Sequence, residues 1–377
     1  MLSRHRPYRA TVAAPLVLLL VVAACGTGAA TPSAAPAPAS PQASSSAAPG
    51  SAAPSDAPSA APASAGTPTK VRLALDWTPN TNHTGFYVAD ANGWYEEAGL
   101  DLDVLPYGGT APEAIVAAHQ AECGISFQDA LTFAVAAGAP VRSVMAILQH
   151  TAQEIAVLES SEITRPRQLD GKIYAGFGYP NEVPTLQAVI EEDGGTGEFD
   201  TVTLDTAAYE ALYQERADFV ITFSAWEGIE AEQRGIPLRS FRFTDYGFPD
   251  FYQVVLACDP DWLARDPEAA RAFVGATVRG FEVAASDPDE AARMLVEQNP
   301  GVFDANTELP LASARFMAEE GLLVDADGDV GTQTLEQWTG YSSFLYEQGL
   351  LSDASGAPLA EPPDYVSLFT NDFLPAP

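Results

Sequence analysis

The sequence is poor in positive charge, histidine and cysteine, and each shortage excludes a class of function. Only 18 Lys and Arg residues stand against 51 Asp and Glu in 377 residues, a formal net charge of −33. A surface this acidic repels phosphate backbones and anionic headgroups, so it excludes binding to nucleic acid or to membranes through a basic patch. The four His and three Cys residues lie far apart in the sequence, without zinc-type spacing.

The sequence also lacks the short motifs of common enzymes. It contains no GxSxG, no Gly-Lys-Ser/Thr phosphate loop, no HExxH and no CxxC, and residues 176–178 (GFG) are only a fragment of GxGxxG. We therefore expect no catalytic residues and no cofactor.

The N-terminus has the pattern of an export signal. Three Arg residues precede an apolar stretch over 11–24 that is too short to span a bilayer as a stable helix. The stretch ends in VAACG at 22–26, which resembles the lipobox of bacterial lipoproteins. The resemblance implies that residues 1–25 hold a lipoprotein signal peptide and that Cys25 carries the lipid that anchors the chain outside the cell membrane. A simple secretory peptide with an incidental Cys is the alternative.

Residues 26–67 are almost entirely Ala, Pro, Ser, Gly and Thr, with one acidic residue, Asp56, and no aromatic residue. Such a segment cannot bury enough apolar surface to fold, so we expect a disordered tether. The acidity therefore belongs to a folded body that begins near residue 68.

Strand-like and helix-like patterns alternate from residue 68 onward. The predicted strands cover 71–76, 100–105, 124–127, 141–148, 172–175, 201–204 and 218–223, and the predicted helices cover 85–97, 111–120, 129–137, 185–192 and 207–215. These units predict an α/β protein with two parallel-type sheets and ligand sites at the carboxyl ends of their strands. From residue 260 the pattern is helical, over 266–286, 289–298, 309–321 and 334–348, and we expect this layer to cover the first domain.

Residues 325–336 resemble a calcium-binding loop. Asp325, Asp327, Asp329 and Glu336 occupy loop positions 1, 3, 5 and 12. Position six, where a sharp turn favours Gly, is Val330. An acidic turn before a helix is therefore the favoured interpretation, and calcium binding is the weaker one.

Aromatic and polar side chains gather after three predicted strands. Residues 76–85 (DWTPNTNHTG) follow the first strand, 107–109 (YGG) the second, and 223–228 (FSAWEG) include the end of the last strand of the second set. Flat rings beside fixed donors and acceptors suit a neutral planar ligand better than a phosphate. Glu227 beside Trp226 could accept hydrogen bonds from an aminopyrimidine-like edge while the indole stacks on the ring. The alternatives are that Trp77 and Trp226 are core residues, that Glu227 is an acid at a helix start, and that His83 is structural.

Four separated motifs carry a resemblance to a known family. Residues 75–89 (LDWTPNTNHTGFYVA) and 91–100 (ANGWYEEAGL) resemble the start of ABC-importer solute-binding proteins of the thiamine-pyrimidine-precursor class. Residues 226–229 (WEGI) and 245–252 (DYGFPDFY) are similar to further motifs of these binders. The relatives include sulfonate- and nitrate-binding proteins and the fungal thiamine pyrimidine synthase. Riboflavin-type binders share the opening motif.

The resemblance, which covers 68–350, implies a two-domain periplasmic-binding-protein-like fold of type II with the ligand cleft between the domains. Domain I would comprise 68–160 plus 258–377, and domain II 161–257. The implied role is capture of a small planar heterocycle for an ABC permease and its ATPase, foremost a pyrimidine of the formylaminopyrimidine or hydroxymethylpyrimidine type. Riboflavin, an alkylsulfonate, an aromatic acid, and a sensor lipoprotein without a transport role are alternatives.

The expected ligand contacts come from both domains. Trp77, Tyr107 and Trp226 would form stacking walls, and Glu227 would accept hydrogen bonds from a ligand amine. The loop 176–181 would turn main-chain amides to the cleft. The remaining expected contacts are Asn82, His83, Gln128, Gly178, Asn181 and Tyr252.

The same resemblance tests the enzyme alternative. The fungal synthase uses a Lys that holds its vitamin-B6 substrate, a nearby His and a later Cys-rich cluster. Alignment through 138–141 (GAPV) puts Ser126 in the place of that Lys and Ala130 in the place of that His. The region of the cluster holds only Cys258, so binding is expected rather than synthesis. Whether Cys123 and Cys258 form a disulfide or remain separate thiols stays open.

Overall fold

The computed structural model describes residues 67–376. The expected signal peptide, the lipidation site Cys25 and the tether up to residue 66 lie outside the described residues. Within 67–376, no helix combines the length and the apolar character needed to cross a membrane.

A five-stranded mixed sheet organises the first lobe. Its strand order is β2-β1-β3-β10-β4. β1 pairs in parallel with β2 and β3, whereas β10 runs antiparallel to β3 and β4. The strands are β1 (Thr69–Ala74), β2 (Leu100–Leu105), β3 (Cys123–Ser126), β4 (Arg142–Ala146) and β10 (Val255–Cys258).

The second lobe holds an antiparallel sheet and a parallel pair. The antiparallel strands follow the order β8-β5-β9, and β6 pairs in parallel with β7. A bridge between Tyr174 and Phe219 joins β6 to the segment before β8. The strands are β5 (Gln153–Leu158), β6 (Ile173–Gly176), β7 (Asp200–Thr203), β8 (Val220–Phe223) and β9 (Leu238–Arg242).

The prediction of two parallel-type sheets is wrong. The repeating strand-helix units do place parallel pairs at β1-β2, β1-β3 and β6-β7. However, β5, β9 and β10 were not among the predicted strands, and each of them pairs antiparallel with its neighbours. Antiparallel strands need no crossover helix, so an alternation of strands and helices in the sequence does not reveal them.

The pairing of β5 and β10 also corrects the expected domain limits. β5 belongs to the second lobe because it pairs with β8 and β9, so residues 153–158 do not belong to domain I. The limit at 257 falls inside β10, which pairs with strands of the first lobe. The chain therefore leaves the first lobe between β4 and β5 and returns between β9 and β10.

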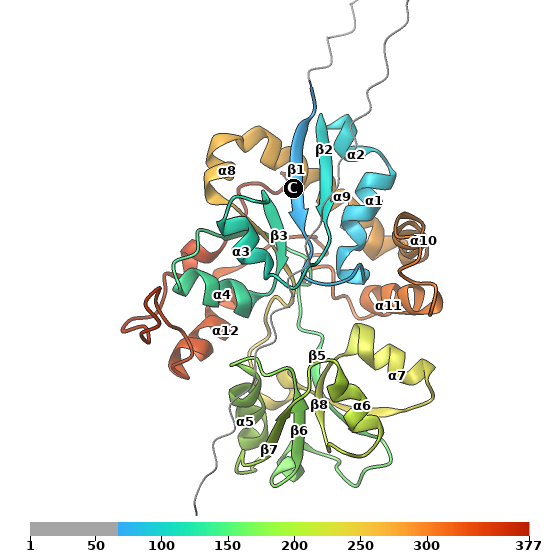
Figure 1. Ribbon diagram of the computed structural model, residues 1–377, viewed down its shortest axis with the longest axis vertical. Helices are drawn as coiled ribbons and strands as arrows, with labels where there is room; N and C mark the ends of the chain where they lie inside the picture. Colours follow the sequence, from blue (N-terminus) through green and yellow to red (C-terminus); the bar gives the residue numbers. More distant parts are fainter. Residues whose placement is uncertain (1–66, 377) are drawn as a thin grey trace, which may run out of the picture. The chain divides into compact units, whose positions relative to one another are not determined.

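Helices cover both faces of the first sheet (Figure 1). On one face, Leu73 clusters with Phe86 of α1 (Thr84–Ala91) and Phe281 of α9 (Pro267–Ser286). On the other face, Ala74 clusters with residues of α3 (Pro112–Ala117), α4 (Gln128–Ala136) and α12 (Leu335–Glu347). The C-terminal helices thus return to the first lobe, as predicted. The remaining helices of this lobe are α2 (Trp94–Glu97), α8 (Pro260–Arg265), α10 (Pro288–Gln298) and α11 (Glu308–Glu319).

Two helices cover opposite faces of β6 in the second lobe (Figure 1). Tyr174 clusters with Leu186 of α5 (Glu182–Glu192), whereas its neighbour Ala175 clusters with Ala208 of α6 (Ala207–Tyr213). Successive strand residues face opposite sides, so each helix buries one side of the strand. The short helix α7 (Ile229–Gln233) follows β8 and a π-helical turn, η3 (Ser224–Gly228).

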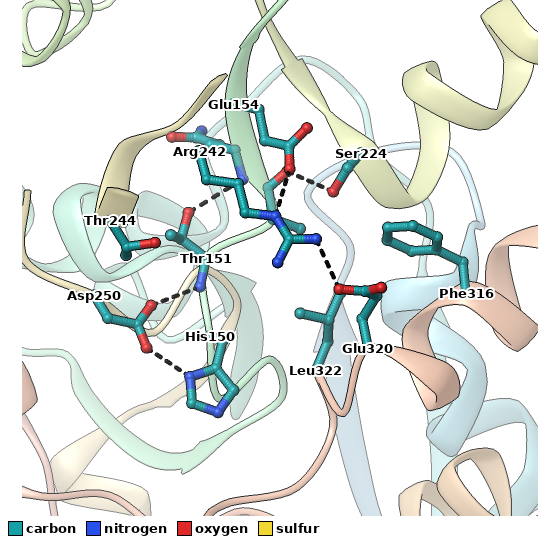
Figure 2. Close-up of a pocket in the computed structure, with 12 residues that line it drawn as sticks. His150, Thr151, Glu154, Ser224, Arg242, Thr244, Asp250, Phe316, Glu320 and Leu322 are labelled. Carbon is teal, nitrogen blue, oxygen red and sulfur yellow. Dashed lines mark hydrogen bonds and ion pairs between the residues drawn. The ribbon is translucent and has the colours of Figure 1, made fainter. Parts of the chain in front are cut away.

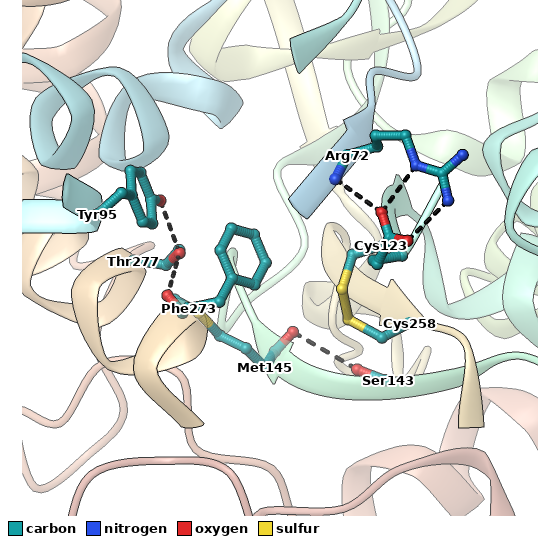
Figure 3. Close-up of a disulfide and its surroundings, with 9 residues drawn as sticks. Arg72, Tyr95, Cys123, Ser143, Met145, Cys258, Phe273 and Thr277 are labelled. Carbon is teal, nitrogen blue, oxygen red and sulfur yellow. Dashed lines mark hydrogen bonds and ion pairs between the residues drawn. A yellow bond between two sulfur atoms is a disulfide. The ribbon is translucent and has the colours of Figure 1, made fainter. Parts of the chain in front are cut away.

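Cys123 and Cys258 form a disulfide, which decides the alternative that the sequence left open. The two residues are direct partners in the antiparallel register of β3 and β10, and both are fully buried (Figure 3). The bond closes a loop with a sequence separation of 135 residues that contains the whole second lobe. The disulfide therefore fixes the point at which the chain returns to the first sheet.

Candidate functional site

A cavity of about 490 Å³ is lined by residues of both lobes. It is bordered by the segments that follow the carboxyl ends of β1, β2 and β3 in the first lobe, and of β6 and β8 in the second. This is where open α/β sheets bind ligands, and it is the position that the strand-helix alternation predicts.

Two aromatic pairs, one from each lobe, line the cavity. Trp77 and Tyr107 lie with their ring centroids 5.4 Å apart, and 41% and 38% of their surfaces stay exposed. Phe177 and Tyr179 stack with centroids 6.2 Å apart and an interplanar angle of 11°. Exposed rings beside a cavity offer apolar area to a planar ligand. Phe177 and Tyr179 were not predicted from the sequence as ligand contacts, because only the main-chain amides of the loop 176–181 were assigned to the cleft.

The loop after β1 is held by His83. The buried His83 ring accepts a hydrogen bond at Nδ1 from the Asn80 amide (3.2 Å) and therefore donates from Nε2 to Asp76 Oδ1 (2.7 Å). The Asn80 side chain in turn accepts from the Asn82 amide at 2.9 Å. Asp76, Asn80 and Asn82 line the cavity, whereas His83 does not. His83 is thus a structural histidine that positions the loop of Trp77, not a ligand contact.

Trp226 and Glu227 reach the cavity from η3. Trp226 also packs against a small cluster of Tyr87, Leu295 and Phe303, so it is partly a core residue. Glu227 Oε2 is buried and has no hydrogen-bond partner among residues 67–376. Burial raises the pKa of this carboxyl from 4.5 to about 7. A buried carboxyl oxygen without a partner costs stability unless a ligand supplies the hydrogen bond.

Gln128 and Tyr252 do not line the cavity, contrary to expectation. The Gln128 amide donates to the backbone oxygens of Gln337 (3.0 Å) and Trp338 (3.1 Å) and accepts from the Tyr252 amide (2.9 Å). The Tyr252 hydroxyl accepts from the Thr334 amide at 2.8 Å. These side chains join α4 and α12 to the segment before β10 through a buried polar network.

Gly178 is also absent from the cavity lining, and two of the main-chain amides of its loop are bonded within the chain. The amides of Phe177 and Gly178 donate to the two carboxylate oxygens of Glu182, at 3.2 and 3.0 Å. Gly178 adopts φ +89°, a conformation that favours glycine. Its role is therefore to close the loop onto Glu182 and not to present an amide to a ligand.

Asn181 lines the cavity, and its side chain connects the lobes. Its amide group donates to Asp129 Oδ2 of α4 (2.8 Å) and to the Tyr341 hydroxyl of α12 (2.9 Å). Burial raises the pKa of Asp129.

The charge of the lining is of one sign. Five carboxyl residues line the cavity: Asp76, Glu113, Asp129, Glu182 and Glu227. No Lys, Arg or His of the described chain is among the lining residues. Burial also raises the pKa of Glu113, which accepts a hydrogen bond from Ser126. Such a lining disfavours anions and favours neutral or cationic ligands that donate hydrogen bonds.

The weak calcium candidate is not assembled in the structure. Asp325 Oδ1 accepts from the amides of Asp327 and Asp329, each at 2.9 Å, and Oδ2 accepts from the Thr332 hydroxyl at 2.6 Å. Across residues 67–376, no group of three or more His, Cys, Asp or Glu residues is placed to hold a metal ion. Asp325 closes a turn before α12, which was the favoured interpretation.

A smaller cavity of about 320 Å³ lies beside the two crossover segments (Figure 2). Arg242 of β9 bridges Glu154 of β5 (3.3 Å) and Glu320, which follows α11 (2.8 Å). His150 pairs with Asp250 across the two crossovers. The charged side chains of this cavity thus pair with one another, and we assign no ligand to it.

The two-lobed fold with its cavity between the lobes defines the class of protein. The structure resembles the alkanesulfonate-binding protein SsuA of Xanthomonas axonopodis pv. citri with a TM-score of 0.59 and 14% identity, over 82% of this chain and 99% of that one. It also resembles the nitrate-binding protein NrtA of Synechocystis PCC 6803 (TM-score 0.59, 13% identity), over 81% of this chain and 87% of that one. The fold is therefore the two-domain fold of periplasmic binding proteins.

Within this class, the chain belongs to the NMT1/THI5-like family, whose model matches residues 80–291. A formylaminopyrimidine-binding protein of Halalkalibacterium halodurans is 28% identical, over 73% of this chain and 84% of that protein. The 4-amino-5-hydroxymethyl-2-methylpyrimidine phosphate synthase THI5 of Saccharomyces cerevisiae is 24% identical, over 82% and 88%. The riboflavin-binding protein RibY of Chloroflexus aurantiacus is 25% identical, over 96% of each chain.

Proposed function

We propose that this protein is the extracytoplasmic solute-binding component of an ABC importer and that it captures an aminopyrimidine precursor of thiamine, of the formylaminopyrimidine or hydroxymethylpyrimidine type. The observation that carries the proposal is the buried Oε2 atom of Glu227, which has no hydrogen-bond partner among residues 67–376 and lies beside Trp226 in a cavity that exposes further aromatic rings. An exocyclic amine on a flat ring matches both features, because it donates hydrogen bonds in the plane while the faces of the ring stack.

The raised pKa of Glu227, about 7, gives the carboxyl a second use. In its ionised form it accepts from the ligand's amine, and in its protonated form it donates to an adjacent ring nitrogen. A 4-aminopyrimidine presents an amine and a ring nitrogen side by side and can engage the group in either state.

The acidic lining favours an unphosphorylated pyrimidine over an anion. A sulfonate or phosphate would lie among the five carboxyl residues of the cavity without a basic side chain of the lining to pair with. Riboflavin is the second candidate, because it is flat and uncharged and because RibY aligns with almost the whole chain. The volume of about 490 Å³ is typical of small-molecule sites.

Binding is favoured over synthesis by the residues that replace the catalytic groups of the fungal enzyme. Ser126, which aligns with the substrate-holding Lys, is buried and donates to Glu113. Ala130, which aligns with the His, lines the cavity with a methyl group. A hydroxyl group and a methyl group cannot supply the amine and the imidazole that the synthase uses.

The export signal and Cys25 would place the protein on the outer face of the cell membrane, held by lipid and by the tether through residue 67. The disulfide between Cys123 and Cys258 supports an oxidising compartment. Delivery of the ligand to a permease and its ATPase would complete the role, without a cofactor.

Calorimetric titration tests the proposal. The full chain with Cys25→Ser, which removes the expected lipidation site, is titrated with formylaminopyrimidine, hydroxymethylpyrimidine, thiamine, riboflavin and taurine. We expect saturable binding of a pyrimidine that Glu227→Gln and Trp226→Ala each weaken. Binding of riboflavin alone would contradict the proposed ligand but agree with the solute-binding role. No binding across the panel would overturn the proposed function.

A further inference from the structure

Gln253 is a cavity residue that the sequence motifs did not reveal. It lies on the segment by which the chain returns to the first lobe, two residues before β10. Its side chain is buried, with 1% of its surface exposed, and it lines the main cavity together with Ala152 of the outgoing segment.

The orientation of the Gln253 amide is determined by the outgoing segment. Its Oε1 accepts hydrogen bonds from the backbone amide of Ala152 and from the Thr151 hydroxyl. Because a backbone N–H can only donate, the oxygen must face Ala152 and the nitrogen must occupy the other side of the group.

The Gln253 nitrogen has no acceptor in the protein. Nε2 is buried and without a hydrogen-bond partner among residues 67–376. A buried amide that keeps one end bonded and the other unpaired costs stability, so a partner from outside the chain is expected where the residue borders a ligand cavity. The nearby polar network does not supply one, because Gln128 is already bonded to Tyr252, Gln337 and Trp338.

We propose that Gln253 is a specificity-determining contact that donates a hydrogen bond from Nε2 to an acceptor atom of the ligand, a ring nitrogen or a carbonyl oxygen. This inference rests on the proposed function, and it deepens it. Glu227 and Gln253 then recognise complementary groups of the ligand. The carboxylate accepts a hydrogen bond from a ligand donor, and the Gln253 amide donates one to a ligand acceptor. A site that pairs both selects aminopyrimidines against flat hydrocarbons and anilines, whose binding would leave the amide unpaired.

The position of Gln253 also links the ligand to the crossovers. The residue sits on one connecting segment and is hydrogen-bonded to the other through Ala152 and Thr151. A ligand acceptor on Nε2 therefore contacts the point where the two segments between the lobes are joined.

The test combines protein variants with ligand analogues. Gln253→Glu keeps an oxygen for the Ala152 amide but, when ionised at pH 8, has no donor, and Gln253→Met removes both functions. The probes are formylaminopyrimidine, its two analogues with one ring nitrogen replaced by C–H, and hydroxymethylpyrimidine, which lacks the formyl carbonyl. Calorimetry gives the dissociation constant of every pair, and the melting temperature of each unliganded variant reports its folding.

We expect both variants to bind formylaminopyrimidine about tenfold or more weakly, the scale of one buried hydrogen bond. One of the probes that lack an acceptor atom should bind the wild type about as weakly as formylaminopyrimidine binds the variants. The affinity of that probe should fall little further in the variants, and the atom that it lacks is then the one that pairs with Nε2. A uniform loss for all probes, or unchanged affinity in both variants, overturns the role of Gln253 while the receptor stands. If the wild type binds none of the four probes, the proposed function fails and this inference fails with it.

Discussion

Replacing Glu227 by Gln should remove a pH dependence from the stability of the unliganded protein. The folded carboxyl keeps its proton up to about pH 7 because burial raises its pKa from 4.5 to about 7. The unfolded carboxyl releases its proton near 4.5, so between these values the unfolded state binds fewer protons. The free energy of unfolding therefore falls as the pH rises through this window and is level above it.

The size of the effect follows from the two pKa values. A difference between 4.5 and about 7 corresponds to about 3 kcal/mol of stability lost by pH 8. Glu227→Gln keeps the size of the side chain but cannot ionise, so the variant should gain stability relative to the wild type by up to about 3 kcal/mol at pH 8. The difference in free energy of unfolding between variant and wild type at pH 4.5 serves as the reference. Measured from that reference, the gain should grow progressively as the pH rises from 4.5 to about 7.

Urea unfolding of both proteins at intervals from pH 4.5 to 8 measures this difference. Subtracting the two curves cancels the contributions of Glu113, Asp129 and Glu154, whose pKa values are also raised by burial. Glu232→Gln is the matched control, because this carboxylate on α7 is exposed, and the variant should follow the wild type. Parallel curves for Glu227→Gln and the wild type would refute the reasoning, since a partnered or solvated carboxyl has no such cost.

Three further predictions follow from the same contacts. Breaking the disulfide with Cys123→Ser and Cys258→Ser should lower the free energy of unfolding by about 2–4 kcal/mol in urea, because it frees a long loop in the unfolded chain; an unchanged midpoint would contradict this. His83→Ala should weaken pyrimidine binding by about tenfold in calorimetry, because the loop loses its bonds to Asp76 and Asn80, and unaltered affinity would show that the loop keeps its shape without them. Hydroxymethylpyrimidine phosphate should bind at least about a hundredfold more weakly than the free alcohol, because the cavity lining of the described chain offers carboxyl groups and no basic side chain; equal affinity would reject the charge argument.

Local patterns were sufficient for the parts of this protein that depend on neighbours in the sequence. The strand-helix alternation predicted the βα units, and parallel strands bring their carboxyl ends to one edge of a sheet, so Trp77 and Tyr107 could be assigned to one such edge and Glu227 to another. The resemblance to solute-binding proteins implied that the two edges share a cleft, and all three residues line the cavity. The same argument could not separate a residue at the cavity from one beside it. His83 lies in the motif of Trp77 but is turned inward by its bonds to Asp76 and Asn80.

The tertiary structure alone decided the features that depend on distant partners. The antiparallel pairing of β5 and β10 set the true crossovers between the lobes, and it brought Cys123 opposite Cys258. The packing of α12 against α4 buries Gln128, which is bonded to the Tyr252 amide, and the nitrogen of Gln253 has no partner among residues 67–376. Whether a buried polar side chain finds a hydrogen-bond partner depends on atoms far away in the sequence. Composition and periodicity do not predict which of those atoms lie nearby in the fold.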